Sequence, residues 1–108
     1  MAEHDFLDEM ISKRTARNPE FPELVEAARR RRDLLHTLAE QREGQHRSQT
    51  AVAAAMATSQ SSVARLETVA TDAKLSTVER YAHSLGYVVQ YHLIPAETGI
   101  DQPAVVVR

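Results

Sequence analysis

Two glutamines and an arginine, side chains that can form paired hydrogen bonds, lie within a short stretch of the sequence, at Gln49, Gln60 and Arg65. Glutamine can form two hydrogen bonds with adenine N6 and N7, and arginine can form two with guanine O6 and N7. Hydroxyl residues that could contact phosphate lie in and beside the same stretch, at Ser48, Thr50, Ser59, Ser61 and Ser62. Hydroxyl groups and helix N-terminal amides can bind phosphates and fix the position of a protein along a duplex.

Two short helices are the elements expected to position these side chains. Ser48 is predicted to cap a helix over residues 49–56, and Ser59 a second helix over residues 60–66. The inward apolar positions are Val52, Met56, Val63 and Leu66. Ala53 is small enough to let the second helix cross close over the first. The outer face of the second helix would then be free for DNA.

Two further helices are predicted before this stretch. Asp5 can cap the first, which ends near Pro19 because proline resists continuation of a helix. The second runs to about Arg42, and Gly44 ends it. Apolar residues recur in both, as Phe6, Leu7, Met10 and Ile11 in the first and as Leu24, Ala27, Ala28, Leu34, Leu35, Leu38 and Ala39 in the second.

A helix and a strand pair are predicted after it. Ser76 with Glu79 forms the pattern of a capping box, for a helix ending at Gly86. Residues 87–94 have the β-branched and aromatic content of a strand, and residues 105–107 could be its hairpin partner. This strand could cover the core, or its exposed edge could pair across a dimer.

The formal net charge is -2. Because neutralisation of phosphates supplies much of the affinity for DNA, a weakly charged protein needs well-aimed contacts, dimerisation or both. The run Arg29–Arg32 could bind nucleic acid, but four consecutive residues spread around a helix. A solvated surface paired with Glu26 and Asp33 is the interpretation that this spread favours.

Other chemistries find little support. There is no cysteine, and the five histidines form no close pair with ligand spacing, so neither a disulfide framework nor a metal site is expected. No nucleophile-base arrangement or phosphate-binding glycine loop indicates an enzyme or a cofactor. The beginning of the chain lacks the pattern of a signal peptide, and no apolar stretch is long enough to span a bilayer, so we expect a cytoplasmic protein.

Residues 47–67 closely resemble the helix-turn-helix of the XRE family, which includes lambdoid phage repressors and Cro proteins. The matching positions are Ser48-Gln49, Val52-Ala53, Met56-Ala57, Gln60-Ser61 and Ala64-Arg65-Leu66-Glu67. One difference is Ala57, where the family usually has a glycine in a left-handed conformation. Another is the loop 68–74, which lacks the usual Gly or Asn after the glutamate.

This resemblance implies roles for individual residues. Gln49 and Gln60 would brace one another, with Gln49 holding a phosphate and Gln60 an adenine edge. Arg65 matches a position that also reads bases, and Ser61 and Ser62 lie at or next to the same face. The implied fold is mainly α, a lambda-repressor-like helix-turn-helix bundle over residues 34–86. An N-terminal helical extension (1–33) and a short C-terminal β-strand or hairpin (87–108) would flank it.

The flanks also resemble HigA-type antitoxins of bacterial toxin-antitoxin pairs. The features are "DFLDEM", "NPEF", the long charged helix and "LSTVERYAHSLGYVVQ". The implied function is a homodimer that represses its own operon and neutralises a RelE-like ribonuclease toxin. The apolar residues Phe6, Leu7, Met10 and Ile11 are predicted to bind the toxin, or else to pack on the long helix. The alternatives are an XRE-type repressor without a toxin, and an interaction module that has lost DNA binding.

Overall fold

The computed structural model describes residues 2–17, 21–69, 73–96 and 102–108, with the side chains of 2–7, 15 and 17 left out. In these residues the chain forms five α-helices and one pair of short strands. The helices are α1 (Ala2–Arg17), α2 (Phe21–Gly44), α3 (Gln49–Ala55), α4 (Gln60–Thr68) and α5 (Leu75–Ser84), and the strands are β1 (Tyr91–Leu93) and β2 (Val105–Val107). The prediction of a mainly helical chain with a C-terminal hairpin is confirmed.

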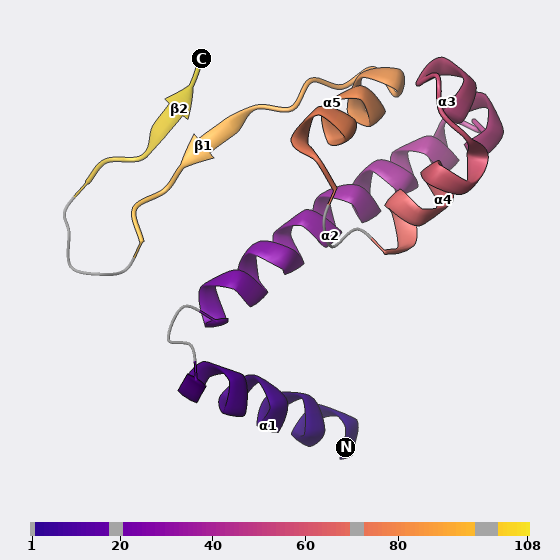
Figure 1. Ribbon diagram of the computed structural model, residues 1–108. Helices are drawn as coiled ribbons and strands as arrows, with labels where there is room; N and C mark the ends of the chain where they lie inside the picture. Colours follow the sequence, from indigo (N-terminus) through magenta and orange to yellow (C-terminus); the bar gives the residue numbers. More distant parts are fainter. Residues whose placement is uncertain (1, 18–20, 70–72, 97–101) are drawn as a thin grey trace.

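Helix α2 is the longest element, with 24 residues, and the other helices gather at its two ends. Helices α3, α4 and α5 surround its C-terminal end, whereas α1 packs against its N-terminal end (Figure 1). The strand pair extends from the end of α5, away from the α3 and α4 helices (Figure 1). Helix α2 therefore separates α1 from the residues expected to face DNA.

One apolar core joins the C-terminal half of α2 to the three shorter helices. The buried hydrophobic residues are Leu35, Leu38, Val52, Ala53, Met56, Val63, Leu66, Val78, Tyr81, Ala82 and Leu85. In the predicted apolar face of α2, Leu24 and Leu34 are instead 55% and 39% exposed. The predicted boundary between residues 33 and 34 falls inside α2, and all the buried residues of α2 follow it.

The helix starts confirm two of the expected caps and correct two others. The Oγ atoms of Ser48 and Ser59 accept hydrogen bonds from backbone amides three residues later, at 3.0 and 3.1 Å, and so cap α3 and α4. Asp5 is not a cap, because α1 already begins at Ala2. The capping box at Ser76 is also wrong, since Lys74 is the N-cap of α5 and makes no side-chain capping bond.

Helices α2, α3 and α5 each end with a residue in the left-handed conformation. These residues are His46, Ala57 and Gly86, with φ of 57°, 55° and 87°. In each case the next residue donates its amide to a carbonyl five residues back, as Thr58 does to Ala53 at 2.9 Å, which is the Schellman motif. Glycine fits this position without strain, whereas a residue with a β-carbon does not. The expected left-handed turn at Ala57 is confirmed.

Replacing Ala57 by glycine is expected to raise the free energy of unfolding by about 1 kcal/mol, because φ is positive there. Ala54→Gly, inside the preceding helix α3, is the matched control, and there we expect a loss of about 1 kcal/mol, the ordinary cost of glycine inside a helix. Urea unfolding of both variants measures the two effects. If both substitutions changed the free energy of unfolding in the same direction, the backbone at Ala57 would not be strained.

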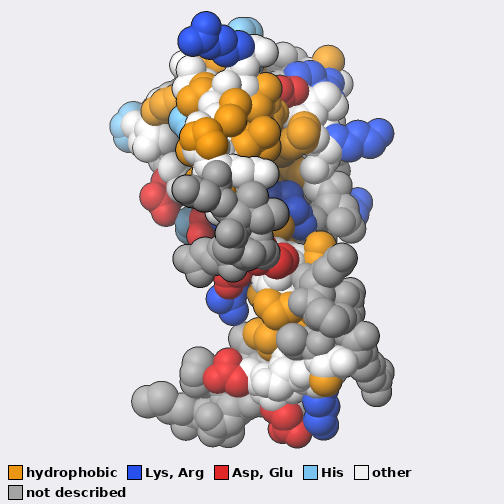
Figure 2. Space-filling view, turned by 90° about the vertical axis from the view of Figure 1, so that its left-hand side faces the viewer, with side chains coloured by type: hydrophobic (Ala, Val, Ile, Leu, Met, Phe, Trp, Pro, Cys, Tyr) orange, Lys and Arg blue, Asp and Glu red, His pale blue; other side chains and the backbone are white. Residues whose placement is uncertain are grey.

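The hairpin is shorter than the sequence pattern suggests. Tyr91, His92 and Leu93 pair antiparallel with Val107, Val106 and Val105, while residues 87–90 form no strand. Tyr91 donates a hydrogen bond from its hydroxyl to Glu79 on α5, at 2.8 Å, and so ties the hairpin to the helices. The three valines of β2 are 47–51% exposed. Figure 2 shows hydrophobic side chains gathered on the face of the molecule that carries this hairpin.

Candidate nucleic-acid interface

Helix α4 has one face in the core and one face in solvent. Val63 and Leu66 are buried, whereas Gln60, Ser61, Ser62 and Arg65 are exposed. Ala53 of α3 is 2% exposed. A small residue at such a place allows two helices to cross at short distance. All four of these exposed residues are among those predicted from the sequence to contact DNA.

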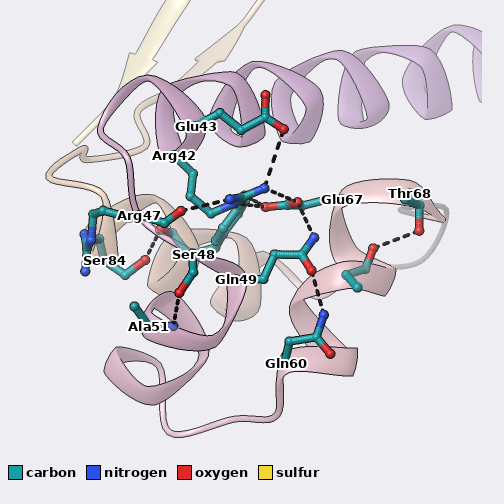
Figure 3. A network of polar contacts seen from close by, with 12 residues as sticks. Arg42, Glu43, Arg47, Ser48, Gln49, Ala51, Gln60, Glu67, Thr68 and Ser84 are labelled. Atoms are coloured by element: carbon teal, nitrogen blue, oxygen red, sulfur yellow. Dashed lines mark hydrogen bonds and ion pairs between the residues drawn. The ribbon is translucent and has the colours of Figure 1, made fainter.

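A chain of side-chain amides connects the start of α4 to the interior (Figure 3). Gln60 Nε2 donates to Gln49 Oε1 at 2.6 Å, and Gln49 Nε2 donates to Glu67 Oε1 at 2.9 Å. The two glutamines therefore brace one another, as the resemblance implied. Both the oxygen and the nitrogen of the Gln49 side chain are hydrogen-bonded within the protein. The orientation of the Gln60 side chain is therefore set before any ligand binds.

Glu67 ends this chain and lies at the centre of a buried ionic cluster. Its side chain is 7% exposed and that of Arg42 is 10% exposed. Arg42 donates from Nε to Oε2 at 2.7 Å and from Nη2 to Oε1 at 3.0 Å. Tyr81, on α5, donates its hydroxyl to Oε2. The cluster thus ties α2, α4 and α5 together beneath the exposed glutamine.

The surroundings of Glu67 favour its charged form. Burial would raise the pKa of its carboxyl group, but hydrogen bonds from Arg42, Tyr81 and Gln49 and the charge of Arg42 outweigh burial and lower the pKa. The hydrogen bond to Glu67 also raises the pKa of the Arg42 guanidinium. Burial, followed by the bond to Glu67, raises the pKa of the Tyr81 phenol. At neutral pH the cluster therefore contains a carboxylate, a guanidinium and a neutral phenol.

The remaining predicted DNA contacts surround the same helix starts. Besides capping α4, the Ser59 Oγ lies 3.1 Å from the Oγ of Ser61 and 2.8 Å from that of Ser62. Ser48 and Thr50 are exposed at the start of α3. Two helix N-termini with hydroxyl groups therefore lie beside Gln60, which is an arrangement that can bind phosphates.

The structure places the predicted partner-binding residues at the other end of α2. Met10 and Ile11 are partly buried and line a groove of 280 Å³ between α1 and α2, together with Phe21, Val25 and Ala28. Arg14, Arg29 and Arg32 also line this groove, which makes its rim basic. The side chains of Phe6 and Leu7 lie outside the described residues. Arg29 is paired with Glu26 at 3.1 Å, as expected for a solvated arginine.

Two members of the ionic cluster, Arg42 and Tyr81, were not predicted from the sequence, and Glu67 was given no role there. A signal for Arg42 was present, because it lies four residues after Leu38 and so on the buried face of α2. A charged residue on a buried face needs a partner. Nothing in the spacing pointed to Glu67, which is 25 residues away.

Among residues 2–17, 21–69, 73–96 and 102–108, no group of three or more His, Cys, Asp or Glu side chains could hold a metal ion. No helix in the same described ranges has both the length and the apolar character needed to cross a membrane. Comparisons of the chain with protein-family models, curated proteins and solved structures gave no match.

Proposed function

We propose that this chain is a sequence-specific DNA-binding protein in which α3 and α4 form a helix-turn-helix and α4 is the recognition helix. The observation that carries the proposal is the arrangement of Gln60, which is exposed at the start of α4 and held by Gln49. Glutamine at the start of a recognition helix can contact a base edge in the major groove. The lambda-repressor-like fold and XRE family membership are part of this proposal.

The wider proposal is that of a HigA-type antitoxin, which neutralises a RelE-like ribonuclease toxin and represses its own operon. The position of α1 supports a separate toxin-binding surface, because α1 lies at the end of α2 opposite to α3 and α4 (Figure 1). A toxin bound there would leave α4 free to contact DNA.

A repressor without a toxin is the second candidate, and one observation favours it. Helix α1 contacts α2 within the chain, and Met10 and Ile11 are partly buried there, so part of their apolar surface is covered without an external partner. An adjacent open reading frame for a small basic protein would distinguish the antitoxin from this repressor. If no duplex is bound in a salt-sensitive manner, the chain is an interaction module instead.

Substitutions in α4 test the DNA contact directly. Gln60→Ala and Arg65→Ala are each expected to weaken binding to a duplex selected from a random library by about 1–3 kcal/mol and to relax base choice. Both side chains are exposed, so the fold should be unchanged. Titration of labelled duplexes with all four bases at each position measures affinity and base choice together.

Gln90→Ala and Arg30→Ala are the matched controls, because both residues are exposed and lie outside α4. We expect them to bind the selected duplex like the unmodified protein. If a folded Gln60→Ala or Arg65→Ala variant keeps full affinity and selectivity, the substituted residue does not read a base.

A homodimer is the expected binding unit, with the hairpin as its contact. An isolated two-stranded hairpin is marginal in water, and β2 has exposed valines, so pairing with the hairpin of a second copy would stabilise both. The selected operator is then palindromic, with half-sites about one helical turn apart. Sedimentation should show two chains per duplex, and Val106→Lys should reduce this number. One chain per duplex at saturation would contradict the dimer.

A further inference from the structure

The chemistry of the Glu67 carboxylate fixes the direction of the hydrogen bonds that end at Gln60. An ionised carboxylate can only accept hydrogen bonds. Glu67 is paired with Arg42, and its lowered pKa keeps it ionised at neutral pH. The amide of Gln49 must therefore turn its nitrogen toward Glu67, as it does at 2.9 Å.

The orientation of the Gln49 amide determines the orientation of the Gln60 amide in the same way. With its nitrogen directed to Glu67, Gln49 presents Oε1 to Gln60, which must donate from Nε2. One hydrogen of the Gln60 amide is then used within the protein. The exposed side of Gln60 retains one N–H donor and the acceptor Oε1.

One donor and one acceptor match adenine better than guanine. In the major groove adenine presents the acceptor N7 and the donor N6, whereas guanine presents two acceptors, N7 and O6. A Gln60 amide held in the opposite direction would use its oxygen inside the protein and present two N–H groups, which suit guanine. The direction of the bonds inside the protein thus decides which purine is preferred.

We propose that Glu67, which contacts no base, determines the preference of Gln60 for adenine over guanine by fixing the direction of the Gln49–Gln60 hydrogen bonds. This proposal rests on the proposed function as a DNA-binding protein. In it Glu67 is a positioning residue that acts through Gln49. Its effect on base choice is separate from its effect on the stability of the fold.

Glu67→Gln tests the proposal with almost no change in shape. An amide at this place can direct either oxygen or nitrogen toward Gln49, so the direction of the chain is no longer fixed. We expect the ratio of dissociation constants for guanine and adenine duplexes, at the position where Gln60→Ala loses discrimination, to fall about tenfold. A ratio is the appropriate readout, because a smaller folded fraction weakens binding to both duplexes equally.

Tyr81→Phe is the matched control. It removes the donor to Glu67 Oε2 but leaves the carboxylate charged and its Oε1 facing Gln49. The variant loses stability, yet its ratio for the two duplexes should stay within about twofold of the unmodified protein. The proposal is overturned if Glu67→Gln keeps the original ratio, or if Tyr81→Phe lowers it equally.

Neutron diffraction from crystals of the deuterated, unmodified protein tests the direction without DNA or substitutions. We expect deuterium on the Gln60 nitrogen facing Gln49, and on the Gln49 nitrogen facing Glu67. Gln60 with its oxygen toward Gln49 would overturn the proposal. If the protein binds no duplex, the proposed function fails and the base preference fails with it, while the neutron result still reports separately on the direction of the hydrogen bonds.

Discussion

Replacing Arg42 by methionine is expected to lower the free energy of unfolding by about 3–5 kcal/mol, the range found when one partner of a buried ion pair is removed. Methionine fills part of the volume of arginine but donates no hydrogen bond. Glu67, whose side chain is 7% exposed, would remain buried without its cation. The variant also loses the bond from Arg42 Nη1 to the Arg47 carbonyl, at 2.9 Å. Urea unfolding at pH 7 measures the loss.

The loss should depend on pH. In the unmodified protein the lowered pKa of Glu67 contributes stability above the pKa of the unfolded glutamate, and this contribution disappears as pH falls through the lowered pKa. Without Arg42 the folded-state pKa of Glu67 rises. Protonation of Glu67, which removes the unpaired buried charge, therefore occurs at a higher pH in the variant. The difference between the two proteins should therefore be largest near pH 7 and shrink below about pH 4.

Arg30→Met, in the same helix but exposed, is the control and should change the stability by less than about 0.5 kcal/mol. A loss below about 1 kcal/mol for Arg42→Met would show that the ion pair is not essential to the fold. A loss independent of pH would show that packing of the side chain, rather than the charge on Glu67, is responsible.

Deleting residues 1–18 is expected to weaken capture of the proposed toxin by roughly a hundredfold or more, while DNA binding survives. Ribonucleases that bind RNA tend to be basic, so the surface of α1 that carries the exposed acidic residues Asp8 and Glu9 is a suitable complement. Glu9 lies on this surface, 65% exposed and paired with Lys13 at 3.1 Å. Calorimetric titration of the protein encoded beside this gene measures capture, and the selected duplex measures DNA binding.

Point variants separate the contribution of charge from that of packing. Glu9→Lys removes an exposed acidic group without disturbing Met10 and Ile11, and it should weaken capture, whereas Lys13→Glu on the same helix should not. The Gln60→Ala variant should bind the toxin with unchanged affinity and show weaker binding only to the selected duplex. The groove beside Met10 has a basic rim, so a partner that is acidic would bind Glu9→Lys more tightly and refute the expected charge pattern. Unchanged capture by the truncated protein would move the interface elsewhere, for example to the hairpin.

The sequence predicted best what neighbouring residues decide. Caps at Ser48 and Ser59 and the stop at Gly86 follow from local geometry, and the structure confirms them. The cap at Ser76 was wrong, because a cap contributes only about 1 kcal/mol and the start of α5 depends on the packing of Val78 and Tyr81 as well. Local patterns predict where helices occur more reliably than where they begin.

The site was predicted only in its outer part. The exposed residues of α4 follow from helical periodicity and from the family resemblance, whereas the ionic cluster joins residues of α2, α4 and α5. Its members are far apart in the sequence, and no periodicity shows which charged residues meet in the interior. The strand prediction was too long for a similar reason, since β1 extends only as far as the three residues of β2 can pair with it.

Helix α2 gives the molecule two levels of local stability within one element. Its buried residues, Leu35, Leu38 and Arg42, all lie in the C-terminal half, whereas residues 21–32 are partly buried or exposed. Local opening of the first half exposes little apolar surface, so its free energy is small compared with that of global unfolding. This half of α2 and the α1 helix can therefore open and close while the rest of the helix and the α4 surface stay folded.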